Sequence, residues 1–139
     1  MKYDFALKLN VMGVLRLWDL SKKFKNLCSF IHTSTSYVNS NKRGLIEEMV
    51  YQFDFDAEEK LIEYLNTPKE KLLSQEASIL KKCGLPNTYT FTKALAEILL
   101  EGRKGDFPLC IVRLSIVGSA YIDPHLGWID NAQAGLILN

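Results

Sequence analysis

The first pattern in the chain is an apolar stripe near its N-terminus. Five large apolar side chains recur there at intervals of mostly three and four residues, namely Leu7, Val11, Val14, Leu15 and Trp18. Residues three and four apart share one face of a helix, so this spacing predicts an amphipathic helix from about residue 3 to 24. The mostly apolar run 27–32 follows and predicts a short buried strand.

A cluster of hydroxyl side chains comes directly after the predicted strand. It consists of Thr33, Ser34, Thr35 and Ser36, and Tyr37 follows it. The next segment, 39–44, is rich in turn residues and predicts a polar loop. Hydroxyl groups are therefore expected at the end of a strand, where they could contact a ligand.

Residues 45–85 have a different character, because glutamate and lysine dominate them. Two helices are predicted, near 56–66 and 68–82, with Pro68 suited to a first helical turn and Gly84 to a helix end. We expect this segment to be a solvated excursion between two core elements rather than a separate domain.

The last part of the chain predicts a helix and then a second strand. Asn87 is a plausible N-cap for the helix, and the run 109–113 predicts a buried strand introduced by Pro108. Helices alternating with strands indicate an α/β fold with a parallel sheet. Only two or three strands are visible, and parallel strands are normally covered on both faces. We therefore expect residues 1–139 to be one partial domain of something larger.

Composition narrows the classes of function. The chain has 139 residues, 47% apolar and 24% charged, as in soluble globular proteins, and its net charge of +1 gives no field that would recruit nucleic acid. The three cysteines form no CxxC pair and only two histidines are present, so no disulfide framework and no metal site are expected. No apolar run approaches the roughly 20 residues that cross a bilayer, and no secretory signal precedes residue 11.

Candidate chemistry lies on the predicted helix at 87–101. Tyr89 and Lys93 are four residues apart and share a face, nearly opposite the face of Phe91, Leu95 and Ile98. A neighbouring ammonium favours a phenolate and is expected to lower the pKa of the Tyr89 phenol, as general acid–base catalysis requires. Taken alone the pair is weak evidence, since the same spacing arises by chance on exposed helix surfaces.

The context supports a functional interpretation of this pair. Ser34 and Thr35 lie upstream at a strand end, where a hydroxyl could polarise a carbonyl, and Asn10 lies on the preceding helix. Asn10, Thr35, Tyr89 and Lys93 together resemble the catalytic tetrad of extended short-chain dehydrogenase/reductases. Longer blocks are similar to those of alcohol-forming fatty acyl-CoA reductases: IEEMVY at 46–51, PNTYTFTKALAE at 86–97, RLSIVG at 113–118 and GWIDN at 127–131.

The resemblance implies a Rossmann-like doubly wound parallel sheet and reduction of a long-chain fatty acyl-CoA to a fatty alcohol with NADPH. It implies that Tyr89 protonates the developing oxyanion and that Lys93 lowers the pKa of Tyr89 and binds the nicotinamide ribose. Thr35, or Ser34 beside it, would donate a hydrogen bond to the carbonyl oxygen. Asn10 would position a water in a proton relay.

The sequence departs from this family in one major respect. Members begin with a strand and a glycine-rich turn that holds the dinucleotide pyrophosphate, and the eight glycines here include no GxGxxG run after a strand. Two smaller departures are Leu114, where proline is usual, and Val14, where threonine is common. We therefore expect the chain to be a fragment that lacks the N-terminal glycine-rich strand-turn-helix and neither binds NADPH tightly nor turns over alone.

Several alternatives remain open at this point. The chain could be a piece of a full-length enzyme, a degenerate relative without catalysis, or a subunit that completes its site with another chain. A thioester reductase acting on carrier-bound acyl groups shares the same features, whereas the long spacer between Thr35 and Tyr89 argues against sugar-nucleotide enzymes. A non-catalytic interaction module is the remaining class. The resemblance also implies an intracellular location at peroxisomes or the endoplasmic reticulum, with any membrane association encoded elsewhere.

Overall fold

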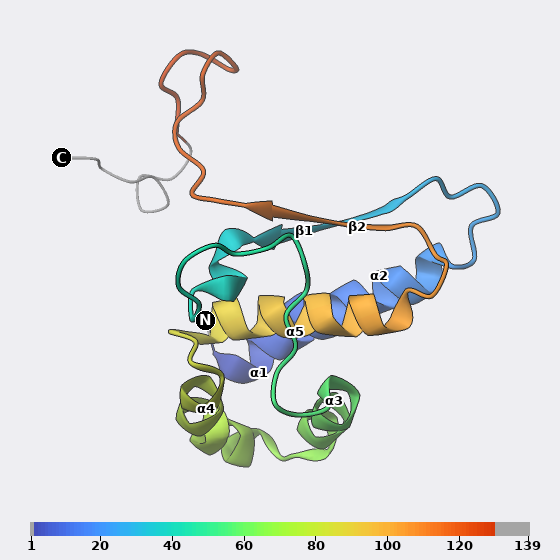
Figure 1. The fold of residues 1–139 in the computed structure, drawn as a ribbon, viewed down its shortest axis with the longest axis vertical. Coiled ribbons are helices and arrows are strands. Elements are labelled where there is room, and N and C mark those ends of the chain that lie inside the picture. The colour runs from blue at the N-terminus through green and yellow to red at the C-terminus, as the bar shows by residue number, and fades with distance from the viewer. Residues whose placement is uncertain (1, 130–139) are drawn as a thin grey trace.

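The computed structural model describes residues 2–129 and shows the predicted α/β alternation (Figure 1). The elements are α1 (Tyr3–Ala6), the π-helical η1 (Leu7–Gly13), α2 (Val14–Ser21), β1 (Phe30–Thr35), the 3₁₀-helical η2 (Ser36–Asn39), α3 (Ala57–Asn66), α4 (Lys69–Cys83), α5 (Thr88–Arg103) and β2 (Leu109–Leu114). The helix α5 lies beneath the sheet, with α3 and α4 farther from it (Figure 1). The predicted fold class is confirmed.

The sheet consists of two parallel strands among the residues that the structure describes. β1 pairs with β2 in a register that runs from Phe30 beside Leu109 to Thr35 beside Leu114. β1 therefore begins three residues later than predicted, and the hydroxyl residues Thr33, Ser34 and Thr35 lie inside the strand. Position along β1 is set by pairing with β2, a long-range contact that an apolar run alone does not specify.

The prediction that both strands are buried is wrong. Exposure alternates along β2, and on β1 the side chain of Ile31 is 64% exposed while its neighbour His32 is buried. The helices of the described chain cover one face of the sheet, and the other face is open (Figure 1). Apolar side chains on the open face, among them Ile31 and Val112, therefore have no cover within residues 2–129.

The first helical segment spans α1, η1 and α2 without a break, close to the predicted range of 3–24. Its apolar stripe packs in the core, where Val11 and Trp18 are fully buried. The sequence did not predict the π turn from Leu7 to Gly13, which inserts a wider helical turn into the middle of the segment. π turns occur frequently at functional sites.

The helix α5 lies at the centre of the packing, in contact with the first helical segment, both strands, α3 and α4. Asn87 caps it as predicted, because its side chain accepts a hydrogen bond from the Thr90 amide at 3.0 Å. The predicted apolar face is confirmed, because Phe91, Leu95 and Ile98 are all buried, but the buried surface is wider than that face. Burial extends around most of α5, and even Glu97 is only 2% exposed.

The predicted helices of the 45–85 segment are confirmed as α3 and α4, and Gly84 ends α4 with a positive φ of 67°. The expectation that this segment is a solvated excursion is wrong in part. Each of the two helices buries one face in the common core, including Leu61 and Tyr64 from α3 and Leu72 and Ile79 from α4. The segment completes the core because the first helical segment and α5 leave an apolar side uncovered.

Candidate active site

Tyr89 and Lys93 lie one turn apart on α5, near its N-terminus. The side chain of Tyr89 is 42% exposed and that of Lys93 is partly buried, whereas the intervening Phe91 is completely buried in the core. The cap at Asn87 fixes where α5 begins, and the i, i+4 spacing then places the phenol and the ammonium on one side of the helix. The prediction that Tyr89 and Lys93 share one face of a helix is confirmed.

Lys93 joins α5 to the sheet. Its ammonium group donates a hydrogen bond to the backbone carbonyl of Thr33 on β1 at 3.0 Å. Partial burial lowers the pKa of Lys93, and the carboxylate of Glu97 opposes that shift. The cation is therefore anchored beside the end of β1 that carries the hydroxyl groups.

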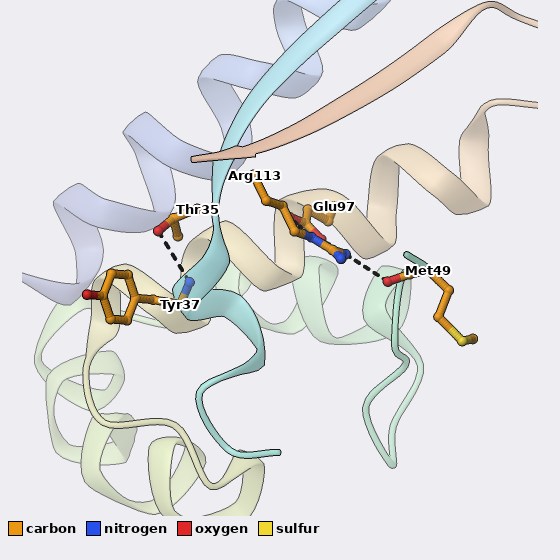
Figure 2. Close-up of polar contacts among 5 residues, drawn as sticks. All are labelled: Thr35, Tyr37, Met49, Glu97 and Arg113. Carbon is orange, nitrogen blue, oxygen red and sulfur yellow. Dashed lines mark hydrogen bonds and ion pairs between the residues drawn. The ribbon is translucent and has the colours of Figure 1, made fainter. Parts of the chain in front are cut away.

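The two candidate hydroxyls at the end of β1 have different environments. The Thr35 hydroxyl oxygen accepts a hydrogen bond from the Tyr37 amide at 3.3 Å and so caps η2 (Figure 2). The Ser34 hydroxyl is buried and has no hydrogen-bond partner among the described residues. Thr35 can still donate its proton, and Ser34 has its full hydrogen-bonding capacity unused. Both residues therefore remain candidate donors to a substrate carbonyl.

Asn10 lies in the π turn and is 9% exposed. Its amide nitrogen donates to the Thr92 hydroxyl at 3.0 Å, and that hydroxyl in turn donates to the Thr88 carbonyl at 2.9 Å. The amide is thus held by α5 at the residue next to Lys93. A role for Asn10 in positioning a water stays a prediction.

The structure brings the predicted residues to three neighbouring elements. The Lys93–Thr33 bond ties α5 to β1, and the Asn10–Thr92 bond ties η1 to α5. Within residues 2–129, no hydrogen bond joins the Tyr89 phenol to these groups. The arrangement can hold a cation and a carbonyl-binding hydroxyl at one end of β1, with the candidate proton donor one helical turn away on α5. Their catalytic roles stay predictions.

A buried ion pair that the sequence analysis did not single out supports this site. Arg113 on β2 contacts Glu97 on α5 through its Nη2, 2.6 Å from Oε2, and through its Nε, 3.1 Å from Oε1 (Figure 2). The same Nη2 donates to the Met49 carbonyl at 2.9 Å. The pair therefore fixes α5, β2 and the segment around Met49 together. The sequence places Glu97 one turn after Lys93 on the predicted helix, but no local pattern indicates that Glu97 is buried.

His32 lies on the buried face of β1, and its Nε2 has no partner among the described residues. Burial lowers the pKa of His32, the charge of Lys93 lowers it further, and Glu97 acts in the opposite direction. Its surroundings therefore favour the neutral imidazole over the charged one.

The described residues hold no cluster of three or more histidine, cysteine or acidic side chains arranged for a metal ion. All three cysteines are free thiols, with Cys83 buried and Cys28 and Cys110 exposed. None of the helices within residues 2–129 has the length and apolar character that a membrane crossing requires. Of the block at 127–131, residues 130 and 131 lie outside the described part of the chain.

The comparisons with a family profile and with individual known proteins agree with one another. The family profile described as male sterility protein, an NAD-binding domain, matches residues 1–138. The alcohol-forming fatty acyl-CoA reductase of Simmondsia chinensis is 35% identical over 95% of this chain and 31% of its own length. Fatty acyl-CoA reductase 1 of Xenopus laevis is 43% identical over 91% of this chain and 24% of its own. The chain thus spans about a quarter to a third of the length of these relatives.

Proposed function

The chain belongs to the male sterility protein family of NAD-binding domains, and we propose on that basis that it is the catalytic part of an NADPH-dependent fatty acyl-CoA reductase. The relatives named above are called fatty acyl-CoA reductases, and they match nearly the whole of this chain. The observation that carries the proposal is the anchoring of Lys93, beside Tyr89, to the hydroxyl-bearing end of β1.

In this proposal Tyr89 is the proton donor. Its partly exposed phenol can reach a substrate oxygen and donate its proton there, with the Lys93 ammonium on the same side of α5. Thr35 or Ser34 donates a hydrogen bond to the thioester carbonyl and stabilises the negative charge that develops on its oxygen. Asn10, held by Thr92, keeps the helix beside the donor in place.

The residues of the candidate site fit the nicotinamide ribose end of NADPH. NADPH supplies a hydride when bound, and Tyr89 and Lys93 are the residues that would hold its nicotinamide ribose. Lys93 suits this role because its hydrogen-bond partner in the structure is a neutral carbonyl, which leaves two donors of the ammonium for hydroxyl groups. No glycine-rich turn in this sequence could hold the pyrophosphate. The proposal includes that the final product of the reduction is a fatty alcohol rather than an aldehyde.

The test begins with the intact mass of the protein from its source, detected after denaturation with an antibody to residues 86–97. The protein of that mass and its variants are then expressed and assayed for NADPH oxidation dependent on long-chain acyl-CoA, with the alcohol product measured by mass spectrometry. Tyr89→Phe is expected to reduce kcat at least about 100-fold, the range of general acid catalysis. Tyr37→Phe is the matched control, because Tyr37 is also 42% exposed and lies beside the same site.

Two outcomes would contradict the proposal. Equal losses of kcat in the Tyr89→Phe and Tyr37→Phe variants would mean that Tyr89 has no special role in proton donation. Activity with carrier-bound acyl thioesters and none with acyl-CoA would favour a carrier-dependent thioester reductase.

A further inference from the structure

A small polar cavity lies where the segment after η2 meets the end of α4. Its volume is about 190 Å³, and the polar side chains in its lining are Asn41, Lys42, Gln52, Asp54 and Lys82. We call it the Lys42–Lys82 pocket. No salt bridge joins either lysine to an acidic side chain among the residues that the structure describes. The pocket therefore presents two ammonium groups that an anionic ligand can neutralise.

Each of the two lysines lies over an aromatic ring. Lys42 Nζ is 4.1 Å from the centroid of the Tyr51 ring, and Lys82 Nζ is 5.3 Å from the centroid of the Phe55 ring. The face of a ring attracts an ammonium group and holds it in place without neutralising its charge. The two ammonium groups are therefore positioned in the lining and still able to donate hydrogen bonds to an anion.

The lining favours a phosphomonoester as the ligand. The charges of the two lysines exceed that of Asp54, so the pocket is positive. A phosphomonoester carries a charge of about −1.5 to −2 and three acceptor oxygens, so both ammonium groups and the Gln52 amide can bind it together. Pockets that hold whole drug-sized ligands measure about 300–1,000 Å³. The smaller volume here suits one charged group at the end of a larger molecule.

The two segments that line the pocket both lead to the candidate active site. Lys42 comes seven residues after Thr35, which ends β1, and Cys83 comes six residues before Tyr89. The Asn41 amide donates to the Cys83 carbonyl at 2.7 Å and so ties the two segments together. Seven residues span at most about 25 Å and six at most about 22 Å. The pocket therefore lies near the candidate site but apart from it, at the end of the sheet where ligands of α/β folds bind.

We propose that the Lys42–Lys82 pocket binds the phosphomonoester on the adenosine ribose of the acyl-CoA substrate. This inference rests on the proposed function, because it takes a coenzyme A thioester as the substrate. The thioester is at one end of that molecule and the phosphorylated adenosine is at the other, so a phosphate site apart from Tyr89 is expected. Acyl groups on carrier proteins lack the adenosine. The pocket therefore distinguishes acyl-CoA from carrier-bound thioesters.

The first experiment compares KM for a long-chain acyl-CoA with KM for the same acyl group on 3′-dephospho-coenzyme A, in the expressed protein and its variants. Lys42→Met and Lys82→Met are each expected to raise KM for acyl-CoA about tenfold, the effect of one charged hydrogen bond. KM for the dephospho substrate should not follow, because that substrate lacks the phosphate. KM for NADPH, which also carries a phosphomonoester, is measured in the same variants and should not rise.

The chain offers a matched control for the two lysines. Lys22 also lies over an aromatic ring, with its Nζ 5.1 Å from the centroid of the Trp18 ring. It follows α2, which ends at the side of the molecule where β1 begins, away from the pocket (Figure 1). Lys22→Met removes the same charge and the same kind of contact, and it should leave every KM unchanged.

A second experiment measures binding without turnover, so it decides on the pocket even if the proposed reaction fails. The ¹⁵N-labelled 139-residue chain is titrated with adenosine 3′,5′-bisphosphate and, separately, with adenosine 5′-monophosphate. Shifts of the amide signals of residues 41–42 and 82–83 are expected to saturate at roughly millimolar bisphosphate. The monophosphate should bind about tenfold more weakly. Lys82→Met should remove that difference, and Lys22→Met should preserve it.

Three results would overturn this inference. KM for acyl-CoA could be the same in the Lys42→Met and Lys82→Met variants as in the parent protein. The two variants could raise KM for NADPH instead, which would assign the phosphate to the cofactor. Finally, the chain could bind the bisphosphate no more tightly than the monophosphate. A protein without acyl-CoA reductase activity would contradict the proposed function, and the titration alone would then decide whether the pocket binds the phosphate.

Discussion

At the scale of single residues, the pair of Glu97 and Arg113 is the clearest test of what holds the site together. Glu97 is 2% exposed and the side chain of Arg113 is 19% exposed, so removing one charge leaves the other without compensation. Glu97→Gln is expected to lower the free energy of unfolding by about 2–4 kcal/mol, as for a broken buried pair. Urea denaturation measures the change.

The chain offers a matched control for that prediction. Glu58 pairs with Arg103 at 2.6 Å through Arg103 Nη2, but the Glu58 side chain is 46% exposed. Glu58→Gln should therefore cost about 0–1 kcal/mol, because solvent screens exposed pairs. Equal losses in the two variants would mean that burial of Glu97 contributes nothing.

His32 gives a second residue-scale prediction, on pH. Burial and the charge of Lys93 lower its pKa below 6.5, so between the folded and unfolded pKa values the unfolded chain binds more protons. The contribution of His32 to stability is then complete above about pH 6.5 and is lost as the pH falls below it. His32→Gln should flatten the loss of stability between pH 7 and pH 5. A slope unchanged by the substitution would assign it to other groups.

At the scale of elements, substitutions of two helix glycines test whether local sequence signals decide where a helix ends. Gly84 has a φ of 67°, and an added Cβ would lie 3.3 Å from Cβ of Asn41, whose amide donates to the Cys83 carbonyl at 2.7 Å. Gly84→Ala should destabilise the chain by about 1–2 kcal/mol, the penalty of a left-handed L-residue. Gly102→Ala, inside α5 and facing open space, should instead stabilise it by about 0.5–1 kcal/mol. Thermal melts of both variants decide this, and a shared direction of change would contradict the argument.

What the sequence could predict follows from the range of the interactions involved. The N-cap at Asn87, the end of α4 at Gly84 and the spacing of Tyr89 and Lys93 depend on residues within a few positions, and all appear in the structure. The start of β1 at Phe30 depends on pairing with a strand about 80 residues later. The π turn around Asn10 and the burial of Glu97 likewise depend on packing against distant elements, so no local pattern indicated them.

At the scale of the whole molecule, two observations indicate how much of its relatives' machinery this chain carries. They are the open face of the sheet and the short span of the chain relative to those relatives. The uncovered face carries Ile31 and Val112, and parallel sheets are normally covered on both faces. The relatives that match are three to four times longer than this chain. Under the proposed function, the candidate site supplies one portion of the machinery of such a reductase, namely the proton donor and the ribose end of the cofactor site.

The last prediction concerns cofactor affinity. Tyr89 and Lys93 could make a few hydrogen bonds to a nicotinamide ribose, each with a net contribution of about 0.5–1.5 kcal/mol, or up to about 3 kcal/mol where the ammonium takes part. The cost of association, estimated at about 4 kcal/mol or more, offsets most of that sum. The Kd of the 139-residue chain for NADPH is therefore expected to be about 1 mM or weaker. Titration of nicotinamide fluorescence measures it, with Lys93→Met as the control that should abolish any residual signal. Saturable binding at micromolar NADPH would show that this chain holds the pyrophosphate by a route other than a glycine-rich turn.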